Sequence, residues 1–135
     1  MLEHMEPLFV KHKVNLILSG HNHAYVRSHP MQQGQLDPSG TGPIYLTIGS
    51  GGAFLARRTI HVTPEDWVAH RDNTEFGFGD LHVINATHAY FSRFLNKPDS
   101  KANPKAQDSV WIRNQKDLGP PTRKMPPLSS LQSDS

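Results

Sequence analysis

Two histidines that directly follow a short apolar run constrain this chain more than any other feature. Residues 14–18 are rich in β-forming side chains and Gly20 ends the run, which predicts a buried strand with His21 and His23 at its carboxyl end. Open α/β sheets bind ligands at that end. In extended backbone, residues two apart point to the same side, so both imidazoles would face one cleft. Imidazole is the commonest metal-ligating side chain. The pattern predicts half of a metal site, and the alternative is two loop histidines without a ligand.

The longer string around these histidines resembles a known family. Residues 20–28 read Gly-His-Asn-His-Ala-Tyr-Val-Arg-Ser. They resemble the Gly-His-Val-His-Ala-Tyr-Glu-Arg-Ser segment of purple acid phosphatases, a branch of the metallophosphoesterase superfamily, and the two departures remove neither histidine. Residues 42–52 are similar to the family's next strand and glycine-rich turn, although Ser50 and Ala53 stand where the family tends to have Asp and Asn. The resemblance covers residues 2–114.

Hydrophobic patterning and this resemblance together predict the fold class. The continuous apolar runs at 14–18 and 44–48 favour central buried strands, whereas the later, alternating runs favour a largely antiparallel set after Phe76. The class is therefore α/β. The resemblance implies the carboxyl-terminal portion of a metallophosphoesterase-type α/β sandwich, with mixed sheets flanked by helices, and incomplete. The other expected elements are a helix near 2–13 shortened or broken by Pro7, a strand at 24–28, a loop at 29–43, an irregular stretch at 53–72 with a helix start at 63–67, and strands at 76–85, 87–95 and 108–113.

Length and composition limit the domain organisation and the partners. The 135 residues have room for one domain. We predict that it covers residues 1–114, followed by a disordered tail at 115–135 where Pro, Ser, Lys and Asp dominate. A net charge of +2 predicts no nucleic-acid or membrane partner, and no apolar stretch approaches the ~20 residues of a membrane span. The absence of cysteine excludes disulfides and thiolate metal sites.

The resemblance implies a binuclear metal centre of Fe(III) with Zn(II), Mn(II) or Fe(II). In it His21 would bind the divalent ion and His23 the ferric ion. The family's remaining ligand motifs are not found in this sequence, and Glu3 and Glu6 lie in the predicted helix. Two ions about 3.5–4 Å apart need a bridging carboxylate, so the ligand set of this chain is incomplete and its catalytic residues are unknown. The chain is interpreted as a truncated gene model, a fragment or a degenerate relative.

The activity that the resemblance implies is acid phosphatase hydrolysis of phosphate monoesters, with this chain inactive alone. Two alternatives stay open: another metallophosphoesterase, such as a phosphodiesterase or nucleotidase, and a non-catalytic sheet-based binding protein. Unpaired strand edges predict self-association. The other histidines, among them His61, His70, His82 and His88, are expected to be packed, hydrogen-bonded or surface residues.

One sequence feature bears on localisation. Asn85 begins the tripeptide Asn-Ala-Thr, an N-glycosylation acceptor within a predicted hairpin turn. The family resemblance implies a secreted or vacuolar/lysosomal protein. The amino terminus of the chain lacks the charged and apolar regions of a signal peptide.

Overall fold

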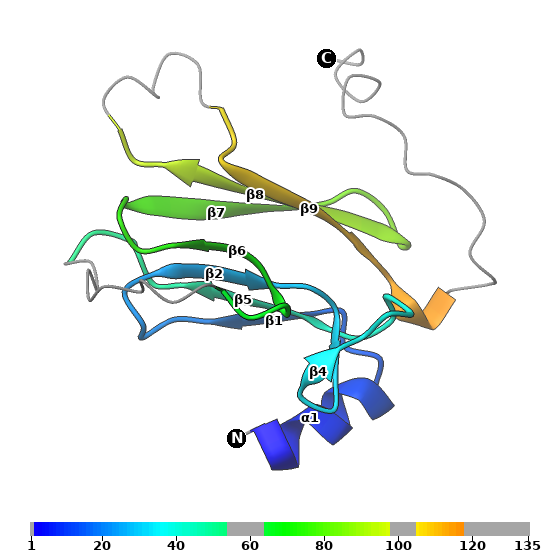
Figure 1. The fold of residues 1–135 in the computed structure, drawn as a ribbon. Coiled ribbons are helices and arrows are strands. Elements are labelled where there is room, and N and C mark those ends of the chain that lie inside the picture. The colour runs from blue at the N-terminus through cyan, green and yellow to red at the C-terminus, as the bar shows by residue number, and fades with distance from the viewer. Residues whose placement is uncertain (1, 54–63, 98–104, 118–135) are drawn as a thin grey trace.

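Two stacked β-sheets form the centre of the part of the chain that the structure describes (Figure 1). The structure is a computed structural model, and it describes residues 2–53, 64–97 and 105–117. The elements in chain order are α1 (Leu2–Lys11), β1 (Leu16–Ser19), β2 (Tyr25–Ser28), β3 (Met31–Gln32), β4 (Gln35–Leu36), β5 (Ile44–Ile48), β6 (Val68–Asp72), β7 (Gly77–Val83), β8 (His88–Leu95), β9 (Asp108–Arg113) and a 3-10 helix (Gln115–Asp117).

The two large sheets differ in strand direction. The four-stranded sheet has the order β1-β5-β2-β6, with β1 and β5 parallel and β2 antiparallel to both β5 and β6. The strands β7, β8 and β9 form a three-stranded antiparallel sheet. In Figure 1 this second sheet lies above the first, and α1 lies below the first sheet. Mixed sheets with few helices confirm the predicted fold class.

Alternating residues of the facing strands build the core between the sheets. The first sheet contributes Tyr25, Ile44 and Leu46, and the second contributes Phe91 and Ile112. In β5, Ile44 and Leu46 are buried and Tyr45 between them is half-buried, as the strand period of two requires. Each large apolar side chain buried in this way contributes about 1.5–3 kcal/mol. The core therefore holds the two sheets together near β5 and β8.

The strand β1 lies at the edge of its sheet, although the sequence predicted a central strand. Its one neighbour among the described residues is β5, and Leu18 is 57% exposed. An apolar run predicts a strand because it must be covered by something, but it does not specify how many strands pair with it. The predicted position of β5 inside the sheet is confirmed.

The helix α1 is short, as expected, but it runs through Pro7 without a break. Proline lacks the N–H of one helical hydrogen bond, yet the turns after it close: the His12 N–H donates to the Leu8 carbonyl oxygen at 2.9 Å. The helix ends with Lys13 at φ 53° and with the Val14 N–H bonded to the Phe9 carbonyl oxygen at 2.8 Å. This is a Schellman ending, which directs the chain into β1.

Several short elements were not predicted. The stretch expected to start a helix at 63–67 instead contains, in its described part, a turn in which the Val68 N–H donates to the Glu65 carbonyl oxygen at 2.9 Å, and this turn leads into β6. The expected loop at 29–43 contains the small β3–β4 hairpin. The predicted tail begins with the 3-10 helix, where the Gln115 N–H donates to the Asn15 Oδ1 atom at 2.9 Å. Its residues 118–135 lie outside the described part of the chain.

Candidate metal-binding loop

The two predicted ligands lie in the connection between β1 and β2. Because β5 lies between these strands in the sheet, residues 20–24 cross over the carboxyl end of β5. The prediction that His21 and His23 follow the carboxyl end of a strand is therefore confirmed. We call residues 20–24 the histidine loop.

The histidine loop consists of two three-residue turns and is not extended. The Asn22 N–H donates to the Gly20 carbonyl oxygen at 2.9 Å, and the Ala24 N–H donates to the Asn22 carbonyl oxygen at 2.8 Å. The first of these is a γ-turn with His21 as its central residue. His21 has φ 70°, and γ-turns with a positive φ at the central residue are rare and strained. His21 is exposed and His23 is half-buried. We expected both imidazoles to point to one side because the backbone would be extended. The loop backbone is not extended, so the premise of this expectation is wrong.

Gly49 supports the histidine loop from below. Its N–H donates to the Ala24 carbonyl oxygen at 3.0 Å. A Cβ atom built at Gly49 would lie 1.8 Å from the Asn22 carbonyl oxygen, whereas one at Gly51 would meet nothing within 4 Å. The sequence suggested that the glycine cluster at 49–52 is a tight turn. The structure adds that its first glycine allows close approach of the loop backbone.

Tyr25 fixes the end of the histidine loop. It is fully buried, and its hydroxyl donates to the Asp108 Oδ2 atom at 2.7 Å. Its ring stacks on Phe91 with centroids 6.3 Å apart, and the Arg93 guanidinium lies 4.6 Å from the ring centroid. Burial and then the hydrogen bond to Asp108 raise the pKa of Tyr25, so the phenol stays a proton donor. The residue two positions after His23 is thereby held by the opposite sheet.

Asp108 connects the two sheets through one carboxylate. Besides the Tyr25 hydroxyl, it accepts the Arg27 Nε–H at 2.7 Å and the Arg27 Nη2–H at 2.8 Å. His70 Nδ1 lies 3.9 Å from the Asp108 Oδ1 atom. Burial alone would raise the pKa of Asp108, but the hydrogen bonds from Arg27 and Tyr25 and the charge of Arg27 lower it. The sequence did not single out Asp108, which lies 83 positions after Tyr25.

A second ion pair lies close to the Tyr25 ring, since its arginine is Arg93. Arg93 is completely buried and donates from Nη1 to the Asp72 Oδ2 atom at 2.7 Å and from Nη2 to the Glu75 carbonyl oxygen at 3.0 Å. Because Asp72 belongs to β6 and Arg93 to β8, this pair also joins the two sheets. A buried arginine needs such a partner, since an unpaired buried charge is very costly.

The described residues offer an incomplete donor set for metal. Among them, no group of three or more His, Cys, Asp or Glu side chains is placed to hold an ion. Two imidazoles fit two ligand positions of a larger site, but a catalytic ion usually needs about three protein ligands. Glu6 is buried and accepts the Gly34 N–H at 2.8 Å, so it ties α1 to the β3–β4 turn.

Three of the other histidines have structural contacts. His82 Nε2 lies 2.8 Å from the Asp80 Oδ2 atom. His88 packs edge-on against Trp111, with ring centroids 6.1 Å apart. His70 is half-buried, with its ring centroid 5.7 Å from that of Tyr25. His61 lies outside the described residues.

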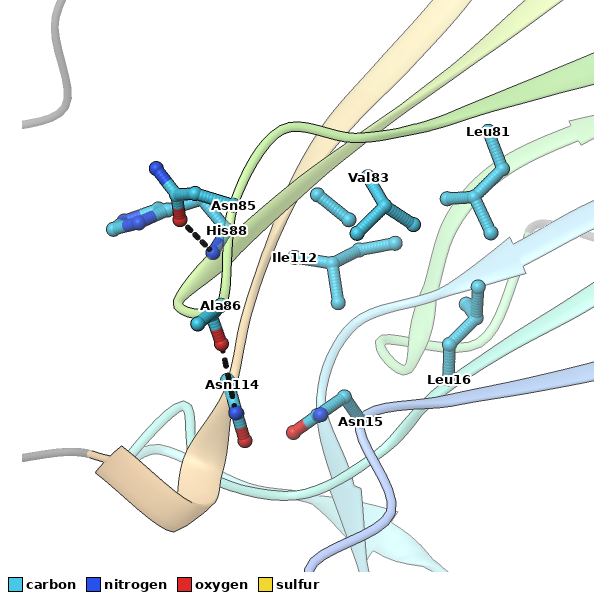
Figure 2. A pocket seen from close by; sticks show the side chains of 10 residues that line it. Asn15, Leu16, Leu81, Val83, Asn85, Ala86, His88, Ile112 and Asn114 are labelled. Atoms are coloured by element: carbon cyan, nitrogen blue, oxygen red, sulfur yellow. Dashed lines mark hydrogen bonds between the residues drawn. The ribbon is translucent and has the colours of Figure 1, made fainter.

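A pocket of about 350 Å³ lies between the two sheets, next to the β7–β8 turn (Figure 2). Leu16 from β1, Leu81 and Val83 from β7 and Ile112 from β9 line its apolar part. Val83 is 75% exposed. At this pocket, apolar side chains of both sheets line a space that is open to solvent.

Asn85 lies in the turn between β7 and β8, beside this pocket. Its Oδ1 atom accepts the Thr87 N–H and the His88 N–H, each at 2.9 Å. In Figure 2 the Asn85 and His88 side chains point away from the apolar part of the pocket. The predicted hairpin turn is confirmed, and Asn85 is exposed in it.

Comparisons with known proteins identify related chains. Residues 42–108 match a family model described as iron/zinc purple acid phosphatase-like protein C. Purple acid phosphatase 18 of Arabidopsis thaliana is 37% identical over 116 residues, which are 84% of this chain and 25% of that protein. Fe(3+)-Zn(2+) purple acid phosphatase 12 of the same plant is 37% identical over 118 residues, which are 81% of this chain and 24% of that protein.

A solved structure has the same fold. The purple acid phosphatase from yellow lupin (Lupinus luteus) seeds matches with a TM-score of 0.70 and 22% identity, over 91% of this chain and 23% of that one. The chain thus spans about a quarter of the length of the relatives it matches. Fold, family model and relatives agree, and the chain belongs to the purple acid phosphatase family, of which it represents a carboxyl-terminal part.

Proposed function

We propose that this chain is part of an acid phosphatase that hydrolyses phosphate monoesters at a binuclear metal centre. The observation that carries the proposal is the histidine loop, which crosses the carboxyl end of β5 in a fold shared with purple acid phosphatases. One relative is named as an Fe(3+)-Zn(2+) enzyme. That name supports iron with zinc, and the resemblance also admits Mn(II) or Fe(II) as the second ion.

Within this proposal, His21 and His23 have different ligand roles. His21 holds the divalent ion and His23 holds Fe(III). When bound, the ions supply Lewis acidity toward the phosphate and a water of lowered pKa. The chain's own contribution is to hold two imidazoles on a loop whose backbone is fixed by Gly49 and Tyr25. The remaining ligands and the acid for the leaving alcohol would come from parts that this chain does not match.

The proposal extends to the domain boundary and the location of the protein. Residues 1–114 form the phosphatase part and 115–135 a tail, of which the first three described residues pack as a 3-10 helix. We propose a secreted or vacuolar/lysosomal protein that carries a glycan on Asn85, an exposed turn residue. Among the described residues, no helix is long and apolar enough to cross a bilayer.

The test replaces the matching segment of purple acid phosphatase 18 with this chain and measures hydrolysis of a chromogenic phosphate monoester at acidic pH. His21→Ala and His23→Ala should each lower turnover by at least about 100-fold, because each ion loses a ligand. His82→Ala, which removes an exposed imidazole paired with Asp80, is the matched control and should change little. The chain alone should show no turnover. Near-normal activity of the His21→Ala chimera would refute the assignment.

A further inference from the structure

The exit of the histidine loop is held by a residue far along the chain. His23 is followed by Ala24 and then by Tyr25, whose ring extends into the space between the sheets and ends at Asp108. The same carboxylate binds Arg27 through two hydrogen bonds. Two residues of β2 are therefore fixed by one side chain at the start of β9.

We propose that Asp108 is a positioning residue that fixes the end of the histidine loop, and with it the direction of the His23 imidazole, through Tyr25 and Arg27. The effect on loop order concerns this chain itself. Its consequence for metal binding rests on the proposed function.

The hydrogen-bond geometry explains why a carboxylate is needed at this position. Both oxygens of Asp108 are used: Oδ2 accepts the Tyr25 hydroxyl and the Arg27 Nε–H, and Oδ1 accepts the Arg27 Nη2–H. Asparagine has one acceptor oxygen and an NH2 group that would face a donor. Asp108→Asn therefore leaves at least one nearly buried donor without an acceptor, which is costly because Asp108 is only 9% exposed.

The other contacts of Tyr25 restrict the plane of its ring, but they do not stop the ring from sliding within that plane. Phe91 stacks on the ring and Arg93 lies over it. Stacking contacts tolerate sliding, whereas a 2.7 Å hydrogen bond to a fixed carboxylate fixes the hydroxyl end of the ring. At the other side of the loop, Gly49 binds the Ala24 carbonyl oxygen. The backbone that follows His23 is thus fixed at two points: Gly49 holds the Ala24 carbonyl oxygen, and Asp108 holds the Tyr25 side chain.

The experiment uses the metal-free chain labelled with 15N. Backbone order parameters of residues 21–24 and the imidazole 15N shifts of His23 are measured by NMR in wild type, Asp108→Asn and Tyr25→Phe. Both variants should lower the order of residues 21–24 and move the His23 shifts toward those of a free histidine. Tyr25→Phe should have the smaller effect because the Arg27–Asp108 pair stays.

Asp37→Asn is the matched control. Asp37 is 8% exposed, almost the same as Asp108, and its carboxylate accepts several hydrogen bonds, among them those from the Gly42 N–H at 2.7 Å and the Ser39 N–H at 2.9 Å. This variant destabilises by the same kind of lost bonds, but in the loop after β4. It should leave the signals of residues 21–24 unchanged, so general loss of stability is separated from positioning.

Metal affinity gives the second measurement. Zn²⁺ alone is titrated into each variant, and Asp108→Asn should weaken the response of the His21 and His23 signals by about tenfold, with Asp37→Asn unchanged. Unchanged loop order in a folded Asp108→Asn chain would overturn the inference. If that variant does not fold, unchanged order in Tyr25→Phe overturns it. If the His21 and His23 signals of the wild-type chain do not respond to Zn²⁺, the proposed function is contradicted. The positioning role is still decided by the order parameters of the metal-free chain.

Discussion

At the scale of single residues, Gly49 shows how the lack of a side chain shapes the candidate site. The Asn22 carbonyl oxygen occupies the space that a Cβ atom of residue 49 would need. Any side chain there must push the histidine loop away or shift the end of β5. The sequence could not reveal this, because a glycine that ends a strand is usually explained by the turn alone.

Gly49→Ala should therefore lower the free energy of unfolding by about 1–3 kcal/mol, the range for overpacking at a close contact. The measurement is urea unfolding of the isolated chain. Gly51→Ala is the matched control, because its Cβ atom would meet nothing within 4 Å, and it should be close to neutral. Equal effects of the two substitutions would mean that the close approach at Gly49 does not matter for stability.

At the scale of elements, patterning predicted the strands that carry apolar side chains and missed those that do not. The strands β5 and β9 match the predicted ranges. The strand β6 was missed because Val-Ala-His-Arg-Asp has little alternation, and its place in the sheet depends on pairing with β2 and on the contacts of His70 and Asp72 with the second sheet. The β3–β4 hairpin has two residues per strand, which is too short for a period to be recognised.

The exposed edge strand β7 leads to a prediction about association. Val83→Lys should reduce self-association, because it places a charge on an apolar residue at an open edge. Analytical ultracentrifugation of the isolated chain measures the effect. Ser109→Lys adds the same charge to β9, the other edge of that sheet, without removing apolar surface. If both variants reduced association equally, net charge and not the apolar edge of β7 would be responsible.

At the scale of the whole molecule, the sheets are joined by polar contacts between distant parts of the chain. The sequence identified His21 and His23 because they are adjacent to a strand and form a recognisable string. It could not identify Asp108, Asp72 or Arg93 as supports, because their partners are set by the stacking of the sheets and not by spacing along the chain. The sequence therefore predicted that the histidine loop follows a strand, but it predicted neither the conformation of the loop nor its supports, and metal binding by His21 and His23 stays a prediction.

These supports predict a specific acid sensitivity. Burial would raise the pKa values of Asp37, Asp72 and Asp108, but their hydrogen bonds, with the charge of Arg93 for Asp72 and of Arg27 for Asp108, lower them below the ordinary value. A lowered folded-state pKa stabilises the protein above the unfolded-state pKa of about 3.9, and this stability is lost as the pH falls through the folded-state pKa. Urea unfolding between about pH 6 and about pH 2 should show this loss.

The Asp37→Asn variant tests the origin of this sensitivity. The difference in unfolding free energy between wild type and Asp37→Asn should be largest above the ordinary aspartate pKa and should shrink in acid, where the wild-type carboxyl is also neutral. A constant difference across the pH range would exclude the Asp37 carboxylate as a source.

The insertion of β5 between β1 and β2 also has a consequence for the order of folding. The two strands that flank the histidine loop do not pair with each other, so the loop closes only after β5 has entered, and Asp108 must still arrive from the far end of the chain. Contacts between distant residues form slowly because chain closure costs entropy before the contacts that it allows are formed.

We expect the Gly49 amide, which is bonded to Ala24, to gain protection from hydrogen exchange late in refolding. Early protection in a pulse-labelling experiment would contradict this order. A newly made chain would then present its histidines to metal first as a mobile peptide and only later as an ordered site.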